Sequence, residues 1–227
     1  MSNQPLTAFI FDFDGTLADT MNHVVPLYNS VADRFKVPQL SPADIPRLRR
    51  MGPRQAMDAY GIPLWKVPRI MHAVTLKLRE QIDRLEPFGG VAETLSTLSL
   101  TGTRCLLLSS NSRENVEAFL RRHRFDFFER LVCGTSLFGK GARLRNVLAQ
   151  ASLLAGSVAY VGDEVRDIEA ARSVGVQSIA VSWGYADRET LLAAKPNYLI
   201  DRPEQLLDFR STSLLESASS AESPRTS

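Results

Sequence analysis

The sequence predicts an α/β protein in which helices cover both faces of a mostly parallel sheet, with an all-helical segment inserted after the first strand. Three features indicate this fold class. Short apolar runs recur along the chain, helical patterns separate the later runs, and a long segment after the first run holds only helical patterns. Strands that alternate with helices form parallel sheets through right-handed crossovers. The expected core is therefore Rossmann-like.

Five runs rich in Val, Ile, Leu and Phe are the expected strands. Their short length and lack of polar alternation are typical of strands that are buried on both faces. In chain order they span residues 8–11, 105–108, 131–133, 158–161 and 178–181. Apolar residues three and four positions apart predict helices between the later runs, through Leu95, Val116, Val147 and Ile168. Gly175 is expected to end the last of these helices.

Residues 20–86, which we call the helical insertion, break the alternation of strand and helix. Helical spacing recurs there, and prolines divide the segment into short helices; Pro26 predicts a late start or a kink in the first one. We therefore divide the chain into an α/β core of residues 1–19 and 87–209, a helical cap of residues 20–86, and a tail of residues 210–227. The Ser-rich composition of the tail predicts disorder.

Composition and charge exclude several classes of protein. Hydrophobic residues are 44% of the chain and charged residues 23%, so its bulk is neither fibrous nor disordered. The 27 basic and 25 acidic residues nearly balance, which argues against nucleic acid or an anionic membrane surface as a partner. No run approaches the roughly 20 apolar residues of a membrane span. Cys105 and Cys133 lie in apolar stretches without nearby histidines, so we expect buried thiols in a reducing cytoplasm.

Acidic residues follow the first and fourth expected strands. Asp12 and Asp14 come at the end of the first strand, and Asp163 follows the fourth. Ligand sites of α/β sheets lie at the carboxyl ends of their strands, and like charges buried together need a cation or a shared proton. Asp167 is placed about one helical turn after Asp163; by itself it would more often be a helix cap. Together these oxygens are suited to Mg²⁺.

Two further residues complete a predicted phosphoryl site. Ser109 ends the second strand, where its hydroxyl and the amides of the next turn could hold phosphate oxygens. Lys140 lies between two glycines, before a helix expected from Ala142, and its ammonium could neutralise a phosphate and an attacking carboxylate. We expect Asp163 and Lys140 to lie within about 10 Å of Asp12.

These residues carry a resemblance to the haloacid dehalogenase-like hydrolases. The sequence resembles the family in four ordered motifs: the apolar strand with Asp12-x-Asp14-Gly15-Thr16, the strand-ending Ser109, Lys140, and Gly162-Asp163-Glu164-x-x-Asp167. The resemblance extends from about Leu6 to Leu207 and is strongest to bacterial phosphatases of the phosphoglycolate phosphatase type. It implies an enzyme of the phosphoric monoester hydrolase class that acts on a small phosphorylated metabolite.

The resemblance also implies roles for particular residues. Asp12 is the implied nucleophile, which forms an aspartyl-phosphate, and Asp14 the general acid and base. Ser109 and Lys140 are the other implied catalytic residues. The implied Mg²⁺ ligands are the Asp12 carboxylate, the Asp14 backbone carbonyl and Asp163, with Asp167 acting through water or behind the direct ligands. The implied substrate-binding residues are Gly15, Thr16, Ser110 and Asn111.

Two alternatives remain at this point. A phosphomutase of sugar phosphates would share all four motifs, and a catalytically weak scaffold protein could retain the fold. Asp14 argues against a dehalogenase, because dehalogenating relatives usually carry an aromatic residue at this position. In the helical insertion, four arginines could recognise a substrate carboxylate or second phosphate, or could simply form a solvated helix face; they are Arg47, Arg49, Arg50 and Arg54.

Overall fold

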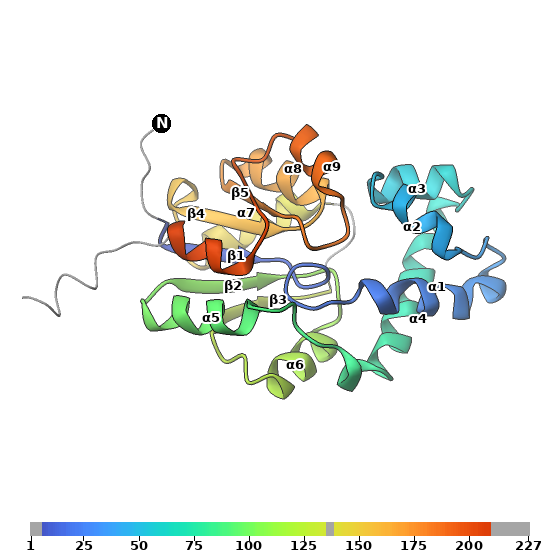
Figure 1. Cartoon of the computed structure of the whole chain (residues 1–227), viewed down its shortest axis with the longest axis horizontal. Helices are drawn as coiled ribbons and strands as arrows, with labels where there is room; N and C mark the ends of the chain where they lie inside the picture. The colour runs from blue at the N-terminus through green and yellow to red at the C-terminus, as the bar shows by residue number, and fades with distance from the viewer. Residues whose placement is uncertain (1–5, 135–138, 210–227) are drawn as a thin grey trace, which may run out of the picture.

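A computed structural model describes residues 6–134 and 139–209 of the chain. Its centre is a six-stranded sheet in the order β3-β2-β1-β4-β5-β6, and every neighbouring pair is parallel (Figure 1). The strands are β1 (Ala8–Phe11), β2 (Arg104–Leu108), β3 (Phe128–Val132), β4 (Val158–Gly162), β5 (Gln177–Val181) and β6 (Tyr198–Ile200). The predicted parallel sheet is confirmed, and β1 lies between β2 and β4 as the site argument requires.

The two outer strands differ from the prediction. β6 was not expected as a strand, because its three residues form too short an apolar run to stand out. β3 begins earlier than the expected run at residues 131–133 and is only partly buried, because it is an edge strand that contains Glu129 and Arg130. The expectation that all five runs are buried on both faces is therefore wrong for β3.

Side chains of the central strands alternate between two buried faces of the sheet. Phe9 and Phe11 join one apolar cluster, and Ala8 and Ile10 join another. The first face is covered by α5 (Val91–Leu100), α6 (Arg113–Arg122) and η5 (Pro203–Phe209), and the second by α7 (Lys140–Gln150) and α8 (Val165–Val174). A short helix, α9 (Arg188–Ala193), follows β5. Each fully buried Phe contributes about 1.5–3 kcal/mol. This core holds the strand ends in place.

The helical insertion contains helices and turns without a strand. Its elements are α1 (Met21–Phe35), η1 (Pro42–Asp44), α2 (Ile45–Leu48), α3 (Pro53–Ala59), η2 (Leu64–Lys66), α4 (Val67–Arg79) and η3 (Ile82–Arg84). Buried side chains such as Leu27 on α1 and Val74 on α4 join the larger apolar cluster. The predicted late start of the first helix is wrong: α1 begins at Met21 and continues through Pro26. Its first turn is closed by the Thr20 carbonyl, which accepts from Val24 N at 3.0 Å.

The chain leaves the core to form the helical insertion and returns to the core at the same place. The outgoing and returning segments are hydrogen-bonded: Asp19 N donates to the Glu86 carbonyl at 2.9 Å, and Phe88 N donates to the Leu17 carbonyl at 3.0 Å. This place lies just beyond Asp12, at the carboxyl end of β1. The insertion consequently lies next to the edge of the sheet where the strands end (Figure 1).

The remaining expectations concern the cysteines, the tail and the membrane. Both cysteines are free; Cys105 is buried, whereas Cys133 is half-buried because it follows the partly exposed β3, which corrects the expectation of two buried thiols. The predicted tail of residues 210–227 lies outside the described residues. Among the helices of the described part, none has the length and apolar character needed to cross a membrane.

Candidate active site

The candidate site lies where the strand order reverses. The chain moves from β1 outward through β2 and β3 on one side and through β4, β5 and β6 on the other. Ligands of open α/β sheets bind at such a switch point, outside the carboxyl ends of the strands. Asp12, Ser109 and Asp163 directly follow β1, β2 and β4. The parallel sheet therefore brings together three polar residues that are far apart in the sequence.

Three carboxylates form a cluster at this point. One oxygen each of Asp12, Asp163 and Asp167 lies within 4.8 Å of the other two, and each residue is at most 2% exposed. Burial, with the charges of nearby carboxylates, raises the pKa of Asp163 well above its usual range. Clustered, buried oxygen ligands of this kind are suited to a hard divalent cation such as Mg²⁺, which would compensate their charge. The residues present fit such a metal.

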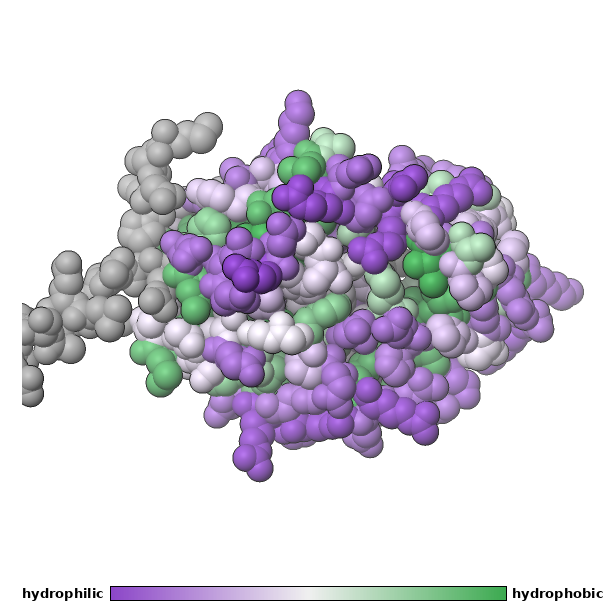
Figure 2. Space-filling view, viewed as in Figure 1, coloured by the Kyte–Doolittle hydropathy of each residue, from purple (hydrophilic) through white to green (hydrophobic). Residues whose placement is uncertain are grey.

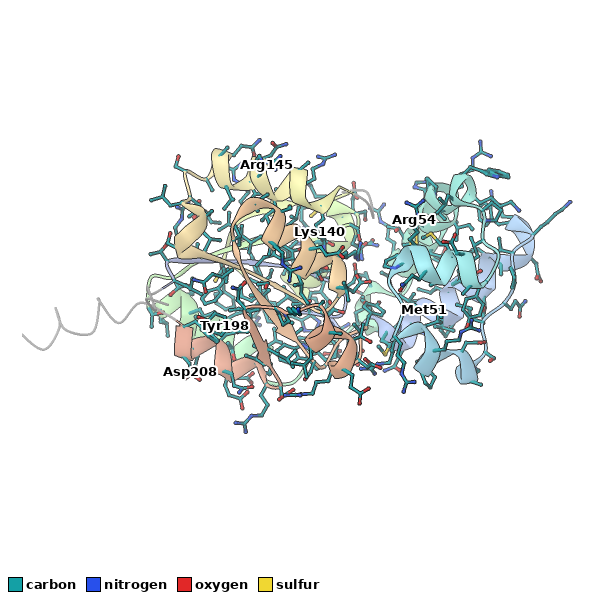
Figure 3. All side chains as sticks on the ribbon, turned by 90° about the horizontal axis from the view of Figure 1, so that it is seen from above. Met51, Arg54, Lys140, Arg145, Tyr198 and Asp208 are labelled. Carbon is teal, nitrogen blue, oxygen red and sulfur yellow. The ribbon has the colours of Figure 1, made fainter. Side chains whose placement is uncertain are left out.

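Lys140 brings a positive charge into this cluster. Its Nζ donates to Asp12 Oδ2 at 2.6 Å and to Asp167 Oδ1 at 2.5 Å, and the side chain is buried within the core (Figure 3). Although burial opposes its charge, Asp12 and Asp167 raise the pKa of Lys140 well above its usual range. The helix starts at Lys140 and not at Ala142 as expected, with Gly139 before it in a left-handed conformation. The ammonium is therefore held at the start of α7.

Two groups orient Asp163. Thr16 Oγ1 donates to Asp163 Oδ1 at 2.7 Å, and the backbone N of Tyr185 donates to Asp163 Oδ2 at 2.7 Å. Thr16, which we expected to bind substrate, is thus directed at a carboxylate of the cluster. Asp163 lies before the start of α8, so it does not share a helix face with Asp167. The two carboxylates still lie close together. Asp167 also caps this helix, because its Oδ2 accepts from Glu164 N at 3.0 Å.

Gly15 is required by close packing at the cluster. Its φ is +77°, and a Cβ there would lie 2.2 Å from Asp163 Oδ2 and 2.4 Å from Tyr185 Cδ2. We expect Gly15→Ala to displace Asp163 and to lower the affinity of the cluster for a divalent cation and kcat/KM by about 10–100-fold, the usual effect of disturbing groups behind metal ligands. Titration of the activity with a divalent cation checks this.

Gly61 supplies the matched control for Gly15. It has a similar φ of +62°, but nothing lies within 4 Å of its hypothetical Cβ. Gly61→Ala should therefore cost about 1–2 kcal/mol in stability for the left-handed backbone and leave the kinetics unchanged. Equal kinetic losses in the two variants would show that Gly15 matters only through its backbone conformation.

Asp14 lies beside the cluster and is held by Asn111. Asn111 Nδ2 donates to both carboxylate oxygens of Asp14, at 3.0 and 3.2 Å. The Asn111 amide is fixed in this orientation because its Oδ1 accepts from Ser112 N at 2.8 Å and from Asn115 Nδ2 at 3.0 Å. Burial, and next the charge of Asp12, raises the pKa of Asp14 to about 7. This carboxyl can therefore be either protonated or ionised near neutral pH.

Ser109 and the turn after it complete the arrangement. Ser109 is fully buried, and its Oγ accepts from Asn111 N at 2.9 Å. Ser110 is half-buried in the same turn, which starts α6 through Ser112 as its N-cap. The turn is thus built around the same Asn111 that contacts Asp14. The structure places Ser109, Asn111 and Asp14 together.

Sequence reasoning missed Tyr185 and Asn115. The backbone N of Tyr185 donates to Asp163, and the Tyr185 hydroxyl is hydrogen-bonded to Thr20 Oγ1 at 2.7 Å. A backbone donor cannot be predicted from the residue type. Asn115, on α6, links Asn111 to the insertion, because its Nδ2 also donates to the Thr75 carbonyl of α4 at 3.0 Å. In the sequence, the only signal for Asn115 was a polar residue on the apolar face of an amphipathic helix.

The four arginines of the insertion have different surroundings. Arg50 pairs with Asp187 of the core at 3.2 Å, and the Arg47 guanidinium lies 5.6 Å from the centre of the Tyr60 ring. Arg54 is exposed. Arg49 is half-buried, and its backbone carbonyl accepts from Asp187 N at 3.0 Å. The structure therefore brings Arg49 and Arg50 to the boundary between insertion and core.

Comparison with known proteins gives consistent matches. A profile of the family described as haloacid dehalogenase-like hydrolase matches residues 9–181. The phosphoglycolate phosphatase of Synechococcus elongatus is 38% identical over 203 residues, covering 89% of this chain and 96% of that protein. The pyrophosphatase PpaX of Bacillus velezensis is 25% identical, and the match covers 91% of this chain and 97% of that protein. A haloacid dehalogenase-like hydrolase from Streptococcus pneumoniae has the same fold, with a TM-score of 0.74 at 18% identity, covering 92% of this chain and 99% of that one.

The fold and the site, with these relatives, define a phosphoric monoester hydrolase built on a parallel sheet. The profile match across most of the chain and the 38% identity place it more specifically: the chain belongs to the haloacid dehalogenase-like hydrolase family. The resemblance inferred from the four sequence motifs is confirmed.

Proposed function

We propose that this protein is a Mg²⁺-dependent phosphatase of small phosphorylated metabolites that works through an aspartyl-phosphate on Asp12. The observation that carries the proposal is the convergence of Asp12, Asp163 and Asp167 on one another, with the Lys140 ammonium in contact with Asp12 and Asp167. The free thiols fit a reducing cytoplasm as the place where it acts. No observation on the described residues favours the phosphomutase or scaffold alternatives.

In the first step, a carboxylate oxygen of Asp12 attacks the substrate phosphorus, and the bond from phosphorus to the leaving oxygen breaks. Asp14 donates its proton to that oxygen, which its pKa of about 7 permits. Lys140, 2.6 Å from Asp12 Oδ2, is placed to neutralise the phosphoryl oxygens, and Ser109 with Ser110 and Asn111 forms their binding turn. Asp12 thus carries the phosphoryl group covalently.

In the second step, the Asp14 carboxylate takes a proton from water, whose oxygen attacks the phosphorus. The bond between phosphorus and Asp12 breaks, and phosphate is released. The Asp12 carboxylate, the Asp14 backbone carbonyl and Asp163 would hold Mg²⁺, with Asp167 acting through water or behind these ligands, and the ion would supply positive charge to both steps. The helical insertion would act as a cap that excludes water and selects the leaving group.

Hydrolysis of a generic aryl phosphate tests the proposed function. We expect phosphate release with Mg²⁺ and its loss on addition of excess EDTA, with recovery when Mg²⁺ is restored, because the clustered carboxylates need a cation to accept an anionic substrate. Phosphoglycolate is the first natural candidate, from the name of the relative at 38% identity. Activity that persists in EDTA would contradict the proposal.

The pKa of Asp14 predicts a pH dependence. Since Asp14 must be protonated in the first step, kcat/KM for an alkyl phosphate should be level below pH about 7 and fall about tenfold per unit above it. An aryl phosphate should show a smaller fall, because its leaving group needs less protonation. Alkyl and aryl profiles of the same shape would contradict the role given to Asp14.

The raised pKa of Asp14 also affects the stability of the fold. It stabilises the folded protein at low pH, and this contribution is lost as pH rises from 3.8 through about 7.

A further inference from the structure

A cavity lies between the helical insertion and the core, beside the carboxylate cluster. Its volume is about 230 Å³. It adjoins the cluster at two points, because Glu164 follows Asp163 in the chain and Tyr185, whose backbone N binds Asp163, also lines the cavity. A leaving group that extends from a phosphate at Asp12 toward the insertion would enter this space.

The wall of the cavity is mostly apolar. Residues of the insertion and of the core contribute to it, including Val24, Val25, Leu48, Met51, Val165 and Ala186. Met51 lies on the side of the insertion that faces the core (Figure 3), and hydrophobic residues gather on the insertion next to its boundary with the core (Figure 2). A sugar or another polyhydroxylated leaving group would leave hydroxyls unpaired against such a wall, which is costly.

The cavity holds one charge without a counter-ion among the described residues. Of its two ionised lining residues, Glu164 pairs with Arg166 Nε at 2.5 Å, whereas Arg49 takes part in none of the ion pairs of the described ranges. The Arg49 guanidinium lies against the thioether of Met21, with Nη1 3.9 Å from Sδ. A half-buried guanidinium in apolar surroundings favours a carboxylate partner, which it can bind through two parallel hydrogen bonds.

The core fixes the position of Arg49. Asp187 accepts from Arg50 Nε at 3.2 Å and donates its backbone N to the Arg49 carbonyl at 3.0 Å. Asp187 of the core thus holds the insertion at two neighbouring residues, at the carbonyl of Arg49 and at the side chain of Arg50. The guanidinium is thus attached to a backbone that is already anchored, which lowers the ordering cost of binding an anion.

The size of the cavity exceeds the two-carbon leaving group of phosphoglycolate. A water molecule occupies about 30 Å³ in the liquid, so 230 Å³ accommodates several groups of that size. We propose that the best substrates are phosphorylated hydroxy acids whose carboxylate pairs with Arg49 and whose hydrocarbon part, longer than that of glycolate, packs on the apolar wall. This inference rests on the proposed function and names the substrate class of the same site.

A matched series of phosphate esters tests the inference. It compares phosphoglycolate with phospholactate and the phosphate esters of 2-hydroxybutyrate and 2-hydroxyvalerate, each beside the alkyl phosphate of equal length without the carboxylate. With Mg²⁺ present, kcat/KM should rise about fourfold for each added CH₂. The carboxylate should add about 10–100-fold. A decline in kcat/KM with chain length would overturn the inference.

Variants of Arg49 isolate the charge. Arg49→Met keeps the length and apolar stem, so it should raise KM for the carboxylate substrates about 10–100-fold and leave kcat and the alkyl phosphates unchanged. Arg49→Lys should recover part of the loss. Arg47→Ala removes the same charge from the insertion at a residue that stacks on Tyr60 outside the cavity, and should leave the whole series unchanged.

Three outcomes separate the inference from the proposed function. Equal losses for carboxylate and alkyl substrates in Arg49→Met would overturn the inference. Mg²⁺-dependent hydrolysis of an aryl phosphate, without preference for carboxylate or chain length, would overturn it and leave the phosphatase function intact. Absence of hydrolysis of every ester, the aryl phosphate included, would overturn both.

Discussion

Asp12→Asn is expected to lower kcat by at least about four orders of magnitude, because the amide cannot form the covalent intermediate. The variant should remain folded: Lys140 keeps its contact with Asp167 at 2.5 Å, and one like charge is removed from the cluster. Steady-state hydrolysis of an aryl phosphate measures the rate, and a thermal melt checks the fold.

The control for this change is Asp33→Asn. Asp33 is an exposed acid on α1, far in sequence from the cluster, and its variant should retain the full rate. A residual rate above about one per cent in folded Asp12→Asn, without reversion by deamidation, would contradict a nucleophilic role and point to direct attack by water.

Lys140→Met should have the second large effect, on stability and on rate together. The substitution removes the ammonium from between Asp12 and Asp167 and breaks both of its buried ion pairs, a change that typically costs about 3–5 kcal/mol. It should also lower kcat by about 10²–10³-fold, as loss of one positioned donor does. Melts with and without Mg²⁺ should show a larger stabilisation by Mg²⁺ in the variant than in the wild type, because the ion replaces part of the missing charge.

Arg145→Met provides the comparison on the same helix. Arg145 is exposed on the outer side of α7 (Figure 3), so its loss should change stability by less than about 0.5 kcal/mol and leave the rate unchanged. A stability of Lys140→Met equal to that of Arg145→Met would mean that Asp12 and Asp167 do not share the charge of Lys140 in the folded protein.

The centre of the fold and of the site could be predicted because topology alone brings certain residues together. Asp12 and Asp163 follow neighbouring parallel strands, so their convergence required only the strand order. Short apolar runs buried on both faces, such as β1 and β4, are distinctive in sequence. The edge strand β3 was misplaced because Glu129 and Arg130, tolerated at the border of a sheet, interrupt its apolar pattern.

Other parts of the site depend on groups that sequence patterns do not reveal. Tyr185 holds Asp163 through a backbone N–H, and Thr16 acts on the same carboxylate and not on a phosphate. Similarly, four arginines with the same local sequence signal separate only in three dimensions: Arg50 pairs with Asp187, whereas Arg49 lines the cavity. Specificity could not be predicted because it depends on how the insertion meets the core.

The most direct test of the account is chemical trapping of the intermediate. The wild-type enzyme, mixed with a ³²P-labelled phosphate ester and Mg²⁺ and quenched in acid within a turnover, should carry label on the peptide that contains Asp12, released by hydroxylamine as an acyl phosphate is. This label should be absent in EDTA and in Asp12→Asn. Turnover without any labelled protein, or label on another peptide, would contradict it.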